Sequence, residues 1–131
     1  STGAAKAIGL VIPELAGKLN GFAVRAPIPT GSIVDLTVET ERPTSIEELV
    51  ELFRERSDVD DLSGVLAYSD EPLVSSDVVK SPYSAIFDAP LTSVVDGTQA
   101  KVVAWYDNEW GYSNRLVELA TRVAVADRAA V

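Results

Sequence analysis

The sequence predicts an α+β fold, a mostly antiparallel sheet with three helices, and three patterns support this prediction. Ile33 to Glu41 alternates apolar and polar side chains, as a strand with one buried and one solvated face does. Residues 46–53 place apolar side chains at helical spacing behind a capping box of Ser45 and Glu48. Short strand-like runs follow from residue 64, and a helical pattern occupies the last stretch of the chain.

The first expected element is a helix from about Gly3 to Ile12, rich in small residues and helix formers. It is apolar on nearly all sides, so we expect this N-terminal helix to be buried. A turn at Asn20-Gly21 precedes an expected strand from Phe22 to Ile28, which prolines and a glycine then interrupt. The strand at 33–41 follows, with the apolar side chains at 34, 36 and 38 on its buried face.

The amphipathic helix that Ser45 opens should present its acidic residues at 47, 51 and 55 to water and end in the acidic loop 57–63. Further strands are expected at 64–68, 84–91 and 100–107. Asp96-Gly97-Thr98 indicates a hairpin between 93–95 and 101–105, with glycine available for positive φ. A C-terminal helix should begin near Ser113 or Asn114 and run towards Asp127. Its expected buried face consists of Leu116, Val117, Ala120, Val123 and Ala124.

Composition restricts the possible functions. At 131 residues the chain can form one domain with a core, and we treat 1–131 as a single domain. The absence of Cys excludes a disulfide, a thiolate zinc site and a thiol nucleophile, and the absence of His removes the commonest general base. The net charge of −9 argues against nucleic-acid binding. No apolar run approaches the roughly 20 residues of a membrane span, and no leader pattern suggests secretion, so we expect a protein without membrane contact.

Two positions could bind an anion. Thr2 and Gly3 stand at the start of the first expected helix, where free N–H groups and the helix dipole favour negative charge. The alternative is that Ser1 or Thr2 only caps that helix. Arg25 lies among apolar neighbours in the second expected element and could hold a phosphate or carboxylate with its guanidinium fork. The alternative there is a structural salt bridge with an acid distant in sequence.

A third candidate site lies at the junction of the last strand and the last helix, over residues 105–113. Four aromatic and four polar side chains gather in this run. The carboxamide of Asn108 has both a donor and an acceptor and could pair with an amide ligand. The alternative is an aromatic cluster that packs the corner, with Asp107 and Asn108 shaping the turn. We find no phosphate loop, dinucleotide fingerprint or metal-ligand cluster in the sequence.

These segments together resemble the phosphorylating glyceraldehyde-3-phosphate dehydrogenase family, in the C-terminal part of its catalytic domain. The S-T-G-A-A-K-A run at 1–7, the L-N-G-F-A-V-R-A-P run at 19–27 and the S-I-V-D-L strand at 32–36 are similar to family motifs. So are W-Y-D-N-E-W-G-Y-S at 105–113 and the stretch between them at 70–77. The resemblance extends from one end of the chain to the other.

The resemblance implies both an activity and roles for residues. Members of this family oxidise glyceraldehyde 3-phosphate through a thioester on a Cys, with a His as base and NAD or NADP as hydride acceptor. Inorganic phosphate then releases 1,3-bisphosphoglycerate. By resemblance, Thr2 and Gly3 belong to the site of the attacking phosphate, and Arg25 holds phosphate on the substrate side. Asn108 would bind the nicotinamide carboxamide and fix which ring face meets the substrate, with Glu109 and Tyr112 close by.

The family's Cys, His and dinucleotide-binding domain precede the S-T-G-A-A-K-A motif, at which this chain begins. We therefore expect a partial domain that supplies no catalytic residue, needs the N-terminal portion of the enzyme as its partner, and is inactive alone. That portion would bind most of the cofactor, and the intact enzyme would be a cytoplasmic homotetramer. Two alternatives stay open, a fragment that acts as a folding or interaction module and a part of an erythrose-4-phosphate dehydrogenase.

Overall fold

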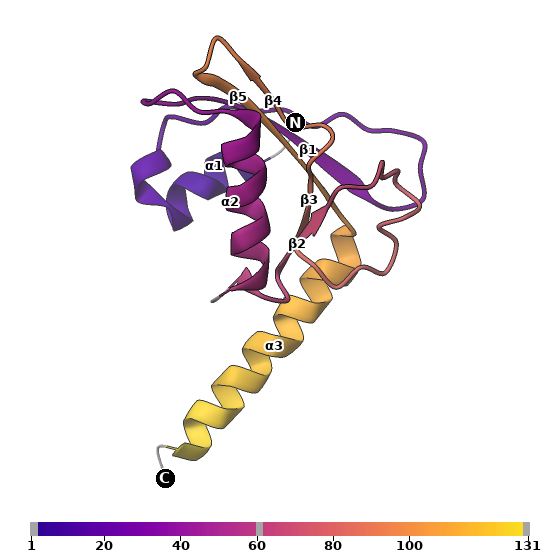
Figure 1. Cartoon of the computed structure of the whole chain (residues 1–131). Helices are drawn as coiled ribbons and strands as arrows, with labels where there is room; N and C mark the ends of the chain where they lie inside the picture. Colours follow the sequence, from indigo (N-terminus) through magenta and orange to yellow (C-terminus); the bar gives the residue numbers. More distant parts are fainter. Residues whose placement is uncertain (1–2, 60–61, 130–131) are drawn as a thin grey trace.

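A computed structural model of the chain describes residues 3–59 and 62–129 (Figure 1). In chain order the elements are the helix α1 (Ala4–Val11), the 3-10 helix η1 (Pro13–Leu15), strand β1 (Ser32–Glu39), helix α2 (Ile46–Asp58), strands β2 (Leu66–Ser69), β3 (Ala85–Asp88), β4 (Ser93–Val95) and β5 (Gln99–Tyr106), and helix α3 (Asn108–Ala129). The α+β class predicted from the sequence is confirmed.

The five strands form one mixed sheet with β5 at its centre. The order is β1-β5-β3-β2, and β4 also pairs with β5. All three partners of β5 run antiparallel to it, whereas β2 and β3 are parallel. The sheet is therefore mostly antiparallel, as predicted, but not purely so. The long connection 70–84 between β2 and β3 permits the parallel pair, because it returns the chain to the same end of the sheet.

Strand β1 shows the predicted alternation, but its apolar face is only partly covered. Val34, Leu36 and Val38 lie opposite residues 104, 102 and 100 of β5 and so share one face of the sheet. Val34 is nevertheless 46% exposed and Leu36 39%. On the other face, Lys101 forms an ion pair with Asp35 at 2.8 Å.

Helix α2 covers the apolar face of the sheet where that face extends over β2 and β3 (Figure 1). The predicted capping box is present, with the Ser45 hydroxyl accepting from Glu48 N and the Glu48 carboxylate accepting from Ser45 N, each at 3.2 Å. The ring of Phe53 stacks on that of Phe87 with centroids 4.2 Å apart. The buried apolar side chains are Val78 in the 70–84 connection, Phe87 on β3, and Ala100 and Val103 on β5, so the small core of the domain lies around β3, β5 and this connection.

The predicted hairpin is also confirmed. Strand β4 pairs with β5 in the register Ser93–Lys101, and the turn contains Asp96 and Gly97 with φ of 50° and 72°. Both residues are in the left-handed region, which an Asp-Gly turn adopts at low cost.

Helix α1 forms where it was expected, but the prediction that it is buried is wrong. Leu10 is 85% exposed and Val11 79%. The extensive contacts of α1 are with η1 rather than with the sheet. An apolar composition shows what a helix would gain from burial, but other elements must supply the covering surface.

The expected strand from Phe22 to Ile28 is likewise wrong. These residues belong to no strand of the sheet, and Phe22 and Val24 are 84% and 79% exposed. Within the segment, Ile28 N donates to Ala26 O at 2.9 Å, a short-range bond in place of a ladder. The prolines at 27 and 29 have no N–H to donate to a neighbouring strand.

Helix α3 differs from the prediction in its start and in its burial. It begins at Asn108, five or six residues before Ser113 or Asn114, and most of it projects away from the sheet (Figure 1). Leu116, Val117 and Val123, expected to be buried, are 52%, 65% and 61% exposed. In the described part of the chain, no helix is long and apolar enough to cross a membrane.

Candidate functional site

The start of α3 is held by a single carboxylate, that of Asp107, which follows directly after β5. This residue is only 5% exposed. Oδ1 accepts from the backbone N–H groups of Glu109, at 3.1 Å, and Trp110, at 2.9 Å. Oδ2 accepts from the N–H of Lys80 at 2.8 Å. Asp107 therefore caps α3 and joins it to the 70–84 connection.

These bonds lower the pKa of Asp107. The largest contributions come from the N–H groups of Trp110 and Lys80, and they outweigh the opposite effect of burial. A carboxylate is also favoured by the positive end of the helix dipole. Asp107 is thus held in its charged form at the point where the candidate ligand residues begin.

Asn108 is the first residue of α3, and its side chain reaches across to the start of β1. Its Oδ1 and Nδ2 lie 3.0 Å and 2.9 Å from the hydroxyl oxygen of Ser32. This contact follows from the sheet, because Ser32 lies opposite Tyr106 in the β1–β5 register. The Asn108 side chain remains exposed to solvent.

The other two predicted cofactor residues lie next to Asn108 on the same helix. Glu109 accepts a hydrogen bond from the hydroxyl of Thr30 at 3.2 Å. Tyr112 lies one turn beyond Asn108 and is 67% exposed. The structure therefore brings Asn108, Glu109 and Tyr112 together on one exposed surface at the start of α3, which we call the Asn108 site.

The alternative for this region is correct in one part, since Asp107 shapes the turn into α3, but the aromatic cluster is absent from the described residues. Trp110 is 47% exposed and Tyr112 is 67% exposed. Trp105 instead donates through Nε1 to the buried carboxylate of Asp88 at 2.8 Å, on the sheet. The aromatic residues of 105–113 thus belong to different surroundings and do not form one cluster at the corner.

The predicted phosphate residues lie elsewhere. Thr2 is outside the described residues. Gly3 is the exposed N-cap residue of α1 and has no side chain with which to cap it. Arg25 is exposed in the segment that precedes β1, and among the described residues it forms no salt bridge, so the structural ion pair considered above is not formed. No hydrogen bond in the described part of the chain links Gly3 or Arg25 to the Asn108 site.

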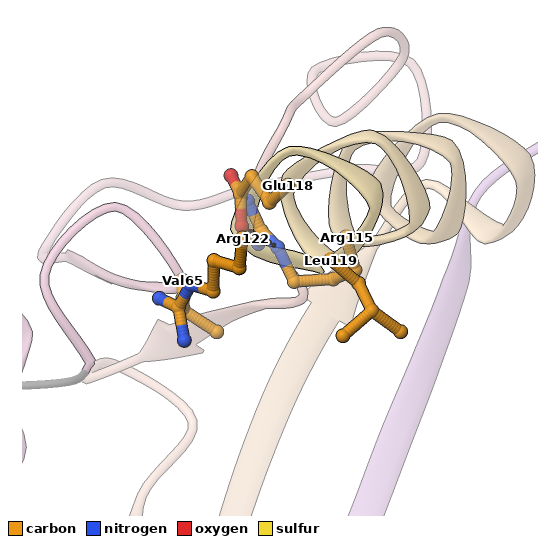
Figure 2. A pocket seen from close by; sticks show the side chains of 5 residues that line it. All are labelled: Val65, Arg115, Glu118, Leu119 and Arg122. Atoms are coloured by element: carbon orange, nitrogen blue, oxygen red, sulfur yellow. Dashed lines mark hydrogen bonds and ion pairs between the residues drawn. The ribbon is translucent and has the colours of Figure 1, made fainter. Parts of the chain in front are cut away.

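A hollow of about 250 Å³ lies beside α3 and is lined by Val65, Arg115, Glu118, Leu119 and Arg122 (Figure 2). The guanidinium of Arg115 is bound by Glu118, whose pKa it lowers. Arg115 also donates to Pro82 O at 3.3 Å and to Ser84 Oγ at 3.2 Å. Because these bonds fasten α3 to the chain just before β3, we assign Arg115 a structural role.

Sequence reasoning named Asp107 only as a residue that shapes the turn, and it missed Ser32. A signal for the capping role of Asp107 was available, because Asp before a run of helical residues is a common N-cap. No local signal marks Ser32, whose contact spans 76 residues. In the described ranges 3–59 and 62–129, no group of three or more Asp or Glu side chains could hold a metal ion.

Comparison with known proteins agrees with this architecture. Residues 1–108 match the family described as glyceraldehyde 3-phosphate dehydrogenase, C-terminal domain. The chain is 59% identical over 123 residues to the glyceraldehyde-3-phosphate dehydrogenases of Mycobacterium avium and Mycobacterium tuberculosis (strain ATCC 25618 / H37Rv). The same identity and length hold for glyceraldehyde-3-phosphate dehydrogenase 2 of Streptomyces arenae. Each alignment covers 94% of this chain and 36% of the relative.

The α+β fold and the match of residues 1–108 to the family model define a C-terminal dehydrogenase domain. The chain belongs to the glyceraldehyde-3-phosphate dehydrogenase family. It spans about a third of the length of the curated relatives it matches.

Proposed function

We propose that this chain serves as the C-terminal part of the catalytic domain in an NAD(P)-dependent dehydrogenase. The reaction is the oxidative phosphorylation of glyceraldehyde 3-phosphate to 1,3-bisphosphoglycerate. The family match and the names of the relatives support this proposal. The observation that carries it at the level of residues is the exposed carboxamide of Asn108, held by Ser32 at the start of α3.

Asn108 would bind the carboxamide of the nicotinamide ring and so decide which face of the ring meets the substrate. A primary amide suits this task, since it donates and accepts at once. Glu109 and Tyr112 would flank the ring, because both lie on the same exposed surface. The nicotinamide cofactor itself supplies the hydride acceptor, and the described residues orient it.

The anions would bind at the other predicted positions. Thr2 and Gly3 would contact the attacking inorganic phosphate, and Arg25 would hold phosphate on the substrate side of the pocket. Two facts support these assignments. Gly3 opens α1 without a side chain that covers the free N–H groups, and the exposed guanidinium of Arg25 is not consumed by a described ion pair.

The sequence contains neither Cys nor His, so the nucleophile and the base would come from the rest of a longer polypeptide. We therefore propose that the 131-residue chain has no dehydrogenase activity by itself. In the intact enzyme we propose a cytoplasmic homotetramer.

The test is steady-state kinetics on a full-length dehydrogenase that carries this segment, with phosphate-dependent formation of the reduced cofactor as the assay. Asn108→Ala should raise the KM for the cofactor, and Arg25→Ala should raise the KM for the substrate or phosphate. Thr37→Ala is the matched control, because Thr37 is exposed on β1 and pairs with Lys101, remote from the Asn108 site. Unchanged kinetics in both site variants would overturn these roles. Activity of the pure 131-residue chain would overturn its predicted inactivity.

A further inference from the structure

We infer that Asp107 and Ser32 are positioning residues that hold the Asn108 carboxamide in place before a ligand binds. Asp107 fixes the backbone on which Asn108 stands, and Ser32 fixes the plane of its amide. This inference rests on the proposed function of Asn108, because a fixed orientation of the amide affects function only if the amide binds a ligand.

The contacts of Asp107 show why it controls the backbone. Two of its three N–H partners are in the first turn of α3, and the third, Lys80, is 27 residues away in sequence. Lys80 has φ of 62°, an unfavourable conformation for a residue with a side chain. The bond from its N–H to Asp107 helps to hold it there. Asn108 therefore follows a residue whose carboxylate is bound both to the first turn of α3 and to the 70–84 connection.

The chemistry of this position requires a carboxylate, since both oxygens of Asp107 act only as acceptors. In Asp107→Asn one oxygen becomes an NH₂ group, which would face either Lys80 N or the N–H groups of α3 as donor against donor. Asp107→Ser keeps a helix cap but cannot reach both sets of donors. Asp107→Ser therefore tests loss of the bond to Lys80 with a helix cap retained, and Asp107→Asn adds repulsion between two donors.

Ser32 acts on the amide directly. Its hydroxyl lies almost equally far from Oδ1 and Nδ2 of Asn108, so it can donate to the first and accept from the second. This pair restricts rotation of the amide about its last side-chain bond. It leaves one N–H and one lone pair of Asn108 for a ligand. Ser32 is itself placed by its pairing with Tyr106.

The experiment uses the full-length dehydrogenase that carries this segment, with Ser32→Ala, Ser32→Thr, Asp107→Asn, Asp107→Ser and Asn108→Ala, and Thr37→Ala as control. Three quantities are measured in each. The first is the change in the KM for the cofactor, compared with the change in the KM for phosphate. The second is the melting temperature. The third is the fraction of deuterium that labelled substrate delivers to each face of the nicotinamide. The last quantity reports orientation and does not respond to loss of stability alone.

Ser32→Ala should raise the cofactor KM about three- to tenfold, because it removes the hydrogen bonds that orient the amide without touching the ligand itself. It should also increase transfer to the wrong face, with the phosphate KM and the melting temperature close to wild type. Ser32→Thr should restore both kinetic quantities, because it keeps the hydroxyl and suits a strand. Asp107→Asn should change the same quantities and lower the melting temperature, and Asp107→Ser should do so less.

The two proposals fail differently. If Asn108→Ala leaves the cofactor KM and the face selectivity unchanged, the proposed function of Asn108 is wrong. If Asn108→Ala changes them and Ser32→Ala does not, the proposed function stands and the inference is overturned. Equal effects of Ser32→Ala and Ser32→Thr would also overturn it. Should Asp107→Asn fail to fold, the Ser32 series decides alone.

Discussion

Gly111 provides the sharpest test of how α3 is seated on the sheet. It lies buried in the first part of α3, where a Cβ atom would come within 2.9 Å of the backbone oxygen of Tyr83. Real Cβ atoms essentially never approach below 3.0 Å. Because the contact is with backbone, a side-chain rotation cannot relieve it. Gly111→Ala must therefore move either α3 or the chain before β3.

Two effects of opposite sign set the magnitude. Replacing a glycine inside a helix by alanine favours the helix by roughly 1 kcal/mol. Overpacking in a closely packed region costs about 1–3 kcal/mol. The upper part of that range applies, because Arg115 bonds to Pro82 and Ser84 and so resists separation of α3 from this segment. We expect Gly111→Ala to lower the free energy of unfolding by about 1–2 kcal/mol.

The measurement is urea unfolding of the 131-residue chain, followed by far-ultraviolet circular dichroism. The matched control is Ala120→Gly, at an exposed position of the same helix, which should lower stability by about 1 kcal/mol through helix propensity alone. If Gly111→Ala raises stability by as much as Ala120→Gly lowers it, the close contact with Tyr83 does not exist. The reasoning about how α3 is seated would then be wrong.

Three further predictions concern the hydrogen bonds of the fold. The pKa of Asp107 is lowered, so its stabilisation should be complete above the unfolded value of about 3.9 and lost as the pH falls through the lower folded value. The difference in urea midpoint between wild type and Asp107→Asn should therefore shrink as the pH falls below about 4, and a constant difference would contradict this. Trp105→Phe removes the 2.8 Å bond to buried Asp88 and should cost about 1–3 kcal/mol in urea unfolding. The exposed control Trp110→Phe should change stability by less than about 0.5 kcal/mol, and equal losses would count against the bond. Ser45→Ala removes one half of the capping box and should cost about 1 kcal/mol by the same assay, and no loss would show that the box does not stabilise α2.

Local signals predicted the elements that local interactions stabilise. The capping box at Ser45 and the Asp96-Gly97 turn involve residues within three positions of each other, and both are confirmed. The segment 22–28 has strand-like residues but belongs to no strand, because a strand requires a partner that its own residues do not specify. The start of α3 was placed too late because the aromatic run hid the cap that Asp107 supplies.

The sequence by itself determined the family, through motifs at 1–7, 19–27 and 105–113, and it pointed to Asn108 as an amide that could bind a ligand. Only the tertiary structure decided how that amide is held. The pairing of β1 with β5 brings Ser32 to Asn108, and the 70–84 connection brings Lys80 to Asp107. These contacts join residues 76 and 27 positions apart, so they depend on strand register and chain path, which no local pattern encodes.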